Sequence, residues 1–213
     1  IKAKLAESQI LMFPGGFSAG DEPDGSGKFI ATLFRNPYLA EGLENLLYKQ
    51  DGLVLGICNG FQALIKLSLL PGGHIETLTA DHPTLTYNTI GRHLSRMVNT
   101  KVISTKSPWM SDAKAGEIYT VPISHGEGRF IASPQQVLEF NKTGQIATQY
   151  VDFDGIASMD SHFNPNQSVA AIEGIYSPDG RVFGKMAHSE RCGAGISKNI
   201  PGQLEMPIFT SGV

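Results

Sequence analysis

Two distant segments of this 213-residue sequence carry residue types suited to nucleophilic chemistry. In "LGICNGFQ", residues 55–62, Cys58 stands between Gly56 and Gly60, after an apolar run and before a helix-like run. This layout matches a strand-to-helix elbow, in which glycines make room for a sharp turn that presents a nucleophile. A thiol at a helix N-terminus is expected to favour the thiolate, because unpaired N–H groups face it. The alternative is a buried cysteine that only fills a strand end.

A thiol nucleophile needs a base, and two of the six histidines, His125 and His188, stand two residues before a glutamate. Residues i and i+2 of an extended chain project to one face, so each carboxylate could hold the tautomer of its imidazole. His188 and Glu190 follow the strand-like "RVFGKMA", whereas glycines interleave His125 and Glu127 and indicate a flexible or tightly turned loop. Because precise sites are built on rigid elements, we favour His188 and Glu190. The other histidines are expected at the surface or in structural roles: His74, His82, His93 and His162.

A glycine pair follows the first apolar run of the chain, at Gly15 and Gly16. Its backbone N–H groups could stabilise an oxyanion, with the amide of Asn59 behind the nucleophile as a second donor. A tight turn without a role in binding is the alternative for this stretch alone. The functional interpretation gains weight because both features end strands that we expect to be neighbours.

Two further patterns do not predict a binding site. "GSGK", residues 25–28, does not complete a phosphate-binding loop, because Glu22 occupies the position of the first glycine and Phe29 follows the lysine. The acidic residues at 21–24 would repel phosphate. They form one short loop that offers few fixed oxygen ligands, so we expect a solvated loop and no metal site.

The composition excludes several classes of protein. With a net charge of -3 and no cluster of lysine or arginine, the chain has no broad attraction for nucleic acid or anionic lipid. No apolar run approaches the ~20 residues needed to cross a bilayer, and the first residues do not resemble a signal peptide. Cys58 and Cys192 are too few for a disulfide framework. These features favour a cytoplasmic globular protein.

The first half of the sequence alternates strand and helix patterns. We expect buried strands at 8–13 and 53–57, helical structure from Lys28, a second helix capped by Asn36, and a third helix at 60–70. Strands that alternate with helices in this way predict an α/β fold with a parallel sheet covered by helices.

The second half is mostly strand-like, and we expect some of its strands to pair antiparallel. "SPDG", residues 177–180, predicts a hairpin turn. A helix is expected at 133–140, where Ser133 and Gln136 could form a capping box. The strand-like segments are 84–88, 95–105, 117–124, 145–151, 168–176 and 181–187.

Taken together, these motifs resemble those of the class I (triad) glutamine amidotransferases, and most closely the glutaminase domains of phosphoribosylformylglycinamidine synthases of purine biosynthesis. The resemblance rests on "PGGFSAGD", "LGICNGFQALIKLSLLP", "SHGEGRF", "NPNQS" and "SPDGRVFGKMAHSER", in that order, and extends from Ile10 to about Gly212. It implies a three-layer, mostly parallel, flavodoxin-like sheet with helices on both faces. Residues 1–213 would form one glutaminase domain.

The resemblance also implies roles for individual residues. Cys58 would attack the side-chain amide of glutamine, His188 would act as acid and base, and Glu190 would orient His188. The backbone amides of Gly16 and Asn59 would form the oxyanion hole. Residues expected to hold the α-amino and carboxylate groups of glutamine are Gln62, Phe163, Asn164 and Asn166.

The same resemblance implies a partner and no cofactor in this domain. Ammonia would pass to a synthetase that uses ATP and Mg²⁺, and we expect that synthetase on the same full-length polypeptide. Two other hypotheses stay open: a cysteine hydrolase of the same fold that acts on another γ-glutamyl or peptide bond, and a catalytically silent docking module. Glutamine assayed beside γ-glutamyl peptides separates the first of these from a glutaminase.

The sequence departs from the family pattern in three places. Ala187 and Ser189 replace the prolines of the usual M-P-H-P-E-R, so we expect a less rigid segment around the histidine. Gln167 stands where glycine is usual in the "NPN" loop. The family's first strand and helix have no counterpart before residues 8–13, so we expect a fragment of a longer polypeptide.

Overall fold

The structure is a computed structural model that describes residues 1–16, 27–193 and 195–213. The acidic run at 21–24 and the first two residues of the stretch at 25–28 lie outside the described residues. Within the described ranges, no helix is both long and apolar enough to cross a membrane.

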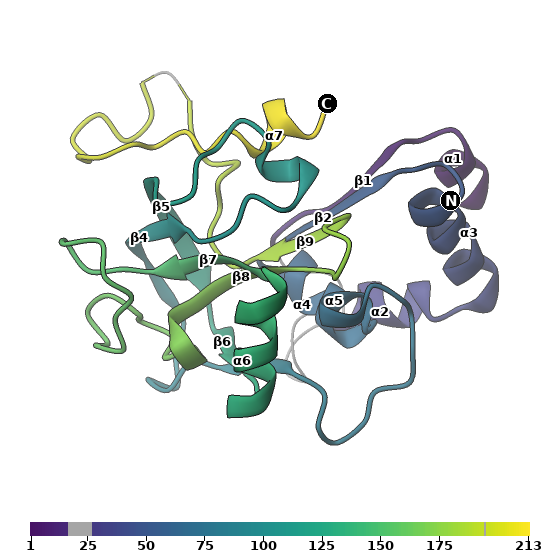
Figure 1. The fold of residues 1–213 in the computed structure, drawn as a ribbon, viewed down its shortest axis with the longest axis horizontal. Helices are drawn as coiled ribbons and strands as arrows, with labels where there is room; N and C mark the ends of the chain where they lie inside the picture. Colours follow the sequence, from purple (N-terminus) through teal and green to yellow (C-terminus); the bar gives the residue numbers. More distant parts are fainter. Residues whose placement is uncertain (17–26, 194) are drawn as a thin grey trace.

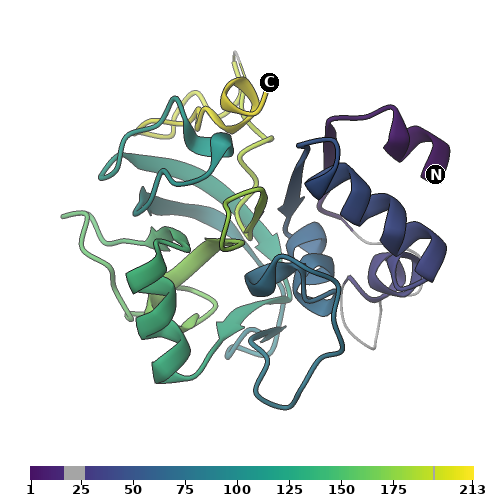
Figure 2. The ribbon, with the colours of Figure 1, turned by 45° about the vertical axis from the view of Figure 1, so that its right-hand side comes forward.

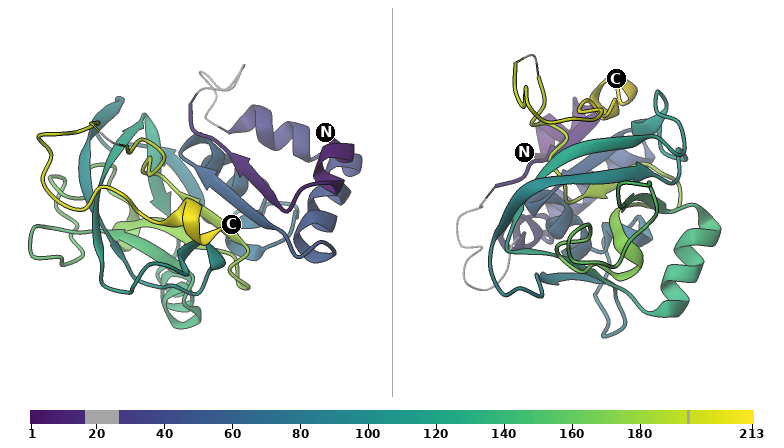
Figure 3. Two further views of the ribbon diagram at one scale, coloured as in Figure 1. Left: turned by 90° about the horizontal axis from the view of Figure 1, so that it is seen from above. Right: turned by 90° about the vertical axis from the view of Figure 1, so that its left-hand side faces the viewer.

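In the part of the chain that the structure describes, seven strands form one sheet in the order β1-β2-β9-β8-β7-β4-β5 (Figure 1). Their bounds, in that order, are Ile10–Phe13, Leu53–Ile57, Val182–Lys185, Ile172–Tyr176, Ile146–Tyr150, Leu94–Val102 and Ile118–His125. Two more strands, β3 (Thr84–Tyr87) and β6 (Glu127–Ile131), pair with each other in a small antiparallel sheet. Figure 3 shows the long strands β4 and β5 curving across one end of the molecule.

The large sheet is mixed, so the expectation of a mostly parallel sheet is wrong. Strands β1, β2 and β9 are parallel neighbours, whereas β9-β8, β8-β7, β7-β4 and β4-β5 are antiparallel. The reason lies in the connections, because parallel neighbours need a long crossover whereas a short turn suffices for antiparallel ones. The predicted turn at 177–180 joins β8 to β9, where Gly180 N–H donates to Ser177 O at 3.0 Å. The α/β class itself is confirmed.

Helices cover the parallel part of the sheet, with α1 (Lys2–Ala6) and α3 (Pro37–Tyr48) beside β1 and β2 in Figures 1 and 2. Helix α4 (Asn59–Lys66) packs on β2 and contacts α2 (Lys28–Phe34). The other helices are α5 (Leu69–Gly72), α6 (Pro134–Thr143) and α7 (Ile208–Ser211), with 3₁₀ turns η1 (Pro108–Met110) and η2 (Val169–Ala171).

Several local predictions are confirmed. The Asn36 side chain caps α3 by accepting from the Tyr38 N–H at 3.0 Å. Ser133 and Gln136 form both bonds of the capping box that starts α6. These ends are fixed by contacts between residues close in sequence, which is why the sequence alone predicts them.

One helix is shorter than predicted, and two elements were not predicted. The helix expected over 60–70 ends at Lys66, because Ser68 takes a left-handed φ of 67° that breaks the helical path. Helix α1 and strand β6 were not expected, and β6 occupies the segment that the glycines suggested to be a loop. Helix α1 precedes β1, and the expectation that the family's first strand is missing from this chain stays a prediction.

Candidate functional site

The three parallel strands β1, β2 and β9 deliver the candidate residues to one edge of the sheet. Gly15 and Gly16 follow β1, Cys58 follows β2, and His188 lies three residues after β9. The carboxyl ends of parallel strands lie at the same edge, where α/β folds place their ligand sites. Topology therefore brings together residues that are far apart in the sequence.

Cys58 occupies the strained turn that the sequence predicts. Its φ of 52° and ψ of -107° lie in a region that residues with side chains rarely adopt, and such outliers concentrate at functional sites. The flanking glycines are sterically required: a Cβ at Gly56 would lie 2.8 Å from the Gly60 carbonyl, and one at Gly60 would overlap the Phe13 carbonyl. Cys58 N–H donates to Lys185 O at 2.8 Å, which ties the turn to β9.

The Cys58 thiol is buried, and its protonation differs from the sequence-based expectation. Burial raises the pKa of Cys58 to about 11, although the backbone N–H groups of Asn59 and Gly16 hydrogen-bond to the sulfur and favour the thiolate. The positive charge of Arg191 lowers this pKa and the negative charge of Glu190 raises it. The helix N-terminus therefore does not outweigh desolvation, and the resting group is a thiol.

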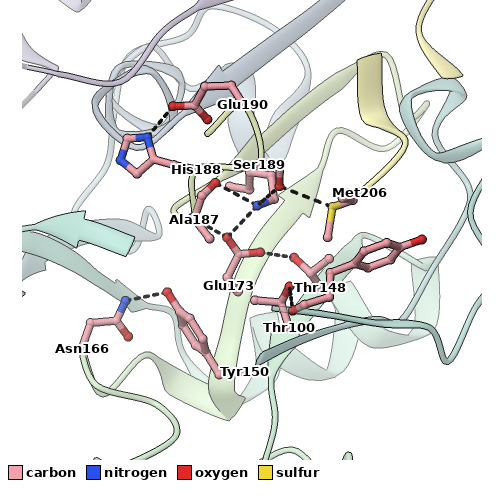
Figure 4. Close-up of polar contacts among 12 residues, drawn as sticks. Thr100, Thr148, Tyr150, Asn166, Glu173, Ala187, His188, Ser189, Glu190 and Met206 are labelled. Atoms are coloured by element: carbon pink, nitrogen blue, oxygen red, sulfur yellow. Dashed lines mark hydrogen bonds and ion pairs between the residues drawn. The ribbon is translucent and has the colours of Figure 1, made fainter. Parts of the chain in front are cut away.

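His188 and Glu190 form the pair that their spacing predicts (Figure 4). The imidazole Nδ1 lies 2.5 Å from the Glu190 carboxylate, and the His188 side chain is buried. Burial raises the pKa of Glu190, but the hydrogen bond and the charge of His188 outweigh burial and lower it overall. An ionised carboxylate on Nδ1 holds the proton there, so Nε2 is the basic nitrogen. Among the described residues Nε2 has no hydrogen-bond partner.

Gly15 shows how close His188 and Cys58 lie. A Cβ placed on Gly15 would be 2.6 Å from the His188 Cε1 atom and 3.3 Å from the Cys58 Cβ atom. The His188 Cε1 atom and the Cys58 Cβ atom are therefore no farther apart than the sum of these two distances. Since a side chain at position 15 would press on both, the glycine is needed for this approach.

His125 also lies near the site, but with different partners. Its Nδ1 lies 3.2 Å from the Asn88 side-chain oxygen, and Asn88 Nδ2 donates to His125 O at 2.8 Å. Burial, together with the charges of His188 and His93, lowers the pKa of His125 to about 3. The ring is therefore neutral at physiological pH. The preceding residue, Ser124, places its carbonyl oxygen 3.6 Å from the Cys58 sulfur.

Gln62, to which the family resemblance assigns a substrate contact, is buried on the first turns of α4. Its Nε2 donates a short hydrogen bond to Glu127 O, which ties α4 to β6. Within the described ranges its Oε1 is buried without a hydrogen-bond partner. That oxygen is a hydrogen-bond acceptor that the described residues leave unused, and contact of Gln62 with a substrate stays a prediction.

The loop at 163–166 is built differently from the expectation of a substrate clamp. Asn166 Nδ2 donates to Gly128 O at 2.7 Å and to Tyr150 Oη at 3.0 Å, and the Asn164 amide donates to Ser168 O at 2.9 Å. Both side chains are fully buried and their donors serve the loop itself. Phe163 packs edge-on against Phe153. Substrate contact by Phe163, Asn164 and Asn166 stays a prediction, and the geometry favours a role in shaping the loop.

The sequence reasoning missed two buried charges, Glu173 on β8 and Lys185 on β9. Both side chains are 0% exposed, and Lys185 Nζ lies 3.3 Å from Glu173 Oε1. The available signal was a single charge inside each apolar strand-like run, "SVAAIEGIY" and "RVFGKMA". Asn88, the partner of His125, carried no comparable signal.

The two cysteines are both free, so they form no disulfide. Among residues 1–16, 27–193 and 195–213, no group of three or more histidine, cysteine, aspartate or glutamate side chains is placed to hold a metal ion.

Comparison with known proteins matches all of the chain. The family model described as "CobB/CobQ-like glutamine amidotransferase domain" matches residues 1–213. Phosphoribosylformylglycinamidine synthase subunit PurQ of Methanococcus maripaludis is 38% identical over 204 residues, which cover 92% of this chain and 70% of that protein. The PurQ subunit of Treponema denticola is 41% identical, with 85% of this chain and 70% of that protein covered. Among solved structures, PurLQS from Thermotoga maritima matches with a TM-score of 0.69 and 26% identity over 96% of this chain and 78% of that chain.

Proposed function

Since this chain belongs to the CobB/CobQ-like glutamine amidotransferase family, we propose that it is the glutaminase component of a phosphoribosylformylglycinamidine synthase in purine biosynthesis. It hydrolyses glutamine to glutamate and ammonia. The observation that carries the chemistry is that Cys58 and His188 both lie against the space that a Cβ of Gly15 would fill, while the Glu190 carboxylate binds Nδ1 of the imidazole.

The first step is attack of the Cys58 sulfur on the side-chain amide carbon of glutamine. Because the resting group is a thiol, its proton must leave as the carbon–sulfur bond forms. His188 Nε2 takes that proton, and Glu190 stabilises the imidazolium through Nδ1. The buried, neutral thiol thus becomes a nucleophile only when the base is in place.

The negative charge of the tetrahedral intermediate develops on the former amide oxygen. The N–H groups of Gly16 and Asn59 already converge on the Cys58 sulfur, so an oxygen bonded to the attacked carbon would lie within their reach. His188 then returns its proton to the amide nitrogen. Ammonia leaves, and a glutamyl thioester remains on Cys58.

Water completes the cycle. His188 Nε2 removes a proton from the water that attacks the thioester carbon, and the proton passes to the departing sulfur. Glutamate is released and the free thiol is restored. The backbone N–H of Gln62 donates to Cys58 O at 3.1 Å, and its buried Oε1 is the contact that we assign to the α-ammonium group of the substrate, since it is an acceptor.

The partner is a synthetase that receives the ammonia and uses ATP and Mg²⁺, so this domain itself uses no cofactor. The related PurQ proteins are named as subunits, and the Thermotoga structure is of PurLQS. This supports a synthetase partner in an assembly, whereas a fusion of both activities on one polypeptide stays a prediction. We propose a cytoplasmic location for the enzyme.

The test uses a glutamine-like diazoketone, which should label the assembled enzyme at Cys58. Cys58→Ser should abolish both labelling and glutamate release, while Cys192→Ser serves as the matched control and should keep both. Label on Cys192 would contradict the assignment. Faster cleavage of γ-glutamyl peptides than of glutamine would favour another hydrolase of this fold, and no glutamate release from the assembly would favour a silent docking module.

A further inference from the structure

A buried ion pair lies beneath the segment that carries His188. Glu173 on β8 and Lys185 on β9 are both 0% exposed, and their charged atoms are 3.3 Å apart. Burying two charges is costly, and a buried pair is often no more stabilising than an apolar pair of the same size. Stability alone is therefore a weak explanation, so the other contacts of these two charges matter.

Those contacts lead to the backbone on both sides of His188 (Figure 4). Glu173 Oε1 accepts from the Ala187 N–H at 2.6 Å, and Lys185 Nζ donates to Ala187 O at 2.8 Å. Lys185 Nζ also donates to Ser189 Oγ at 3.0 Å. On the opposite side, Thr148 Oγ1 donates to Glu173 Oε2 at 2.5 Å and fixes the carboxylate.

The Glu173–Lys185 pair provides the hydrogen bonds to the backbone beyond the end of β9. Strand β9 finishes at Lys185, and Met186 N–H makes one last bond to Glu173 O at 3.2 Å. Beyond that point Ala187 leaves the ladder, yet it is fully buried, so its N–H and C=O need partners. The side chains of Glu173 and Lys185 supply both. A proline at position 187 would lack the N–H that Glu173 binds.

We propose that Glu173 and Lys185 are positioning residues that fix the 187–189 backbone and thereby aim the His188 imidazole at Cys58. The inference rests on the proposed function, because it assigns His188 the proton transfers of glutamine hydrolysis. His188 N–H donates to Pro122 O at 2.8 Å, so β5 holds the same residue from the other side. Neither Glu173 nor Lys185 touches the reacting atoms in this scheme. Their effect is on where His188 lies.

The experiment compares single and double variants in the full-length enzyme with its synthetase. Glu173→Met and Lys185→Met each leave one buried charge without its partner and should lower both the thermal midpoint and kcat. The double variant E173M/K185M removes both charges and should recover the thermal midpoint. Its kcat for glutamine hydrolysis should stay reduced by about 10- to 100-fold, because a misplacement of about 1 Å has that effect. KM for glutamine should stay within about twofold, since no glutamine contact is removed.

Two further variants separate an effect on the position of His188 from a loss of stability. Ala187→Pro deletes the N–H that Glu173 binds, while also fixing φ at this position, and should lower kcat without changing KM. Ser107→Ala removes a buried hydrogen bond to Gly180 O, far from His188, and is the matched control for loss of stability. It should lower the thermal midpoint while kcat stays unchanged.

Recovery of wild-type kcat in the folded double variant would overturn the inference, because the pair would then serve stability alone. A rise in KM at constant kcat would overturn it as well, since the pair would then act on substrate binding. The proposed function is tested separately by His188→Asn. If that variant keeps its activity, the proposed function fails. If it is inactive while the double variant is fully active, only the positioning role fails.

Discussion

The same three-residue pattern, histidine, one residue, glutamate, occurs twice in this chain and has two different outcomes. At 188–190 the histidine binds its own glutamate at 2.5 Å. At 125–127 the histidine instead faces the side-chain oxygen of Asn88 at 3.2 Å, and the glutamate carbonyl accepts from Gln62. Both histidines are buried; His188 meets Cys58 at Gly15, and His125 follows Ser124, whose carbonyl oxygen lies 3.6 Å from the Cys58 sulfur.

The difference comes from where each segment sits in the sheet. His188 has left β9 and turns back toward the end of β2, so its side chain meets Gly15 and Cys58. His125 is the last residue of β5, Gly126 alone connects it to β6, and β6 pairs with β3. Equal local spacing thus gives a carboxylate-paired base in one place and a neutral ring on an amide in the other. The following predictions test that distinction, from the largest expected effect to the smallest.

Replacing the two histidines by the same residue should separate their roles most strongly. His188→Asn should lower kcat/KM for glutamine by about 10⁴-fold, since it removes the group that takes the thiol proton. His125→Asn should cost less than about 10-fold, because Asn88, and not a carboxylate, holds the His125 Nδ1 atom. Steady-state glutamate release by the assembled enzyme measures both. Equal losses for the two variants would erase the distinction.

The two glutamates form the next comparison. Glu190→Gln should reduce kcat by about 10³-fold, because a neutral amide no longer enforces the Nδ1 tautomer or stabilises the imidazolium. Glu127→Gln, at the corresponding position of the other segment, should reduce kcat by less than about 10-fold, since its backbone contact to Gln62 survives. The measurement is kcat at saturating glutamine. A larger loss for Glu127→Gln would show that the wrong carboxylate has been assigned.

An alanine at either of two glycines should displace one of the two histidines, which allows their roles to be compared again. The Cβ of Gly15→Ala would press on His188 and Cys58, and the Cβ of Gly128→Ala would press on the ring of His125. Displacing His188 should lower kcat by about 10²-fold, whereas displacing His125 should have a smaller effect. Labelling of Cys58 by the diazoketone should slow in parallel with kcat for Gly15→Ala. Unchanged labelling would mean that the imidazole does not activate the thiol.

The smallest effect concerns acid stability. The folded-state pKa of His125 is lowered from 6.5 to about 3, so between these values the unfolded chain binds a proton that the folded chain does not. Stability is therefore fully present above pH 6.5 and falls as the pH drops toward 3, by up to about 1.4 kcal/mol per pH unit. Between pH 6.5 and 5, wild type should lose about 2 kcal/mol more than His125→Asn in urea unfolding. The same pH dependence in both proteins would contradict a neutral, buried His125.

Much of the local structure could be predicted because neighbouring residues determine it. Asn36 before Pro37, and Ser133 with Gln136, define helix starts that the structure confirms. The glycines around Cys58 predict the turn, and its φ of 52° bears that out. The less rigid segment expected from Ala187 and Ser189 has compensating contacts, because these two residues bind the Glu173–Lys185 pair.

Long-range features could not be predicted in this way. The sequence predicts antiparallel strands in the second half but not their order, so it does not show that these strands continue the parallel sheet. Strand β6 was missed because glycines dominate "HGEG", although pairing with β3 makes it a strand. The pKa of Cys58 was expected to be low from the helix N-terminus, and burial reverses the sign.

The sequence by itself determined the chemical parts: a cysteine in a glycine-flanked elbow, and a histidine two residues before a glutamate. Only the tertiary structure decided which histidine meets Cys58 at Gly15, whether that thiol rests protonated, and which residues hold the backbone around His188. The physical reason is that spacing along the chain sets which face a side chain occupies, whereas burial and partners depend on strands brought together from distant positions. Gly15, Cys58 and His188 meet because β1, β2 and β9 run parallel and end at one edge.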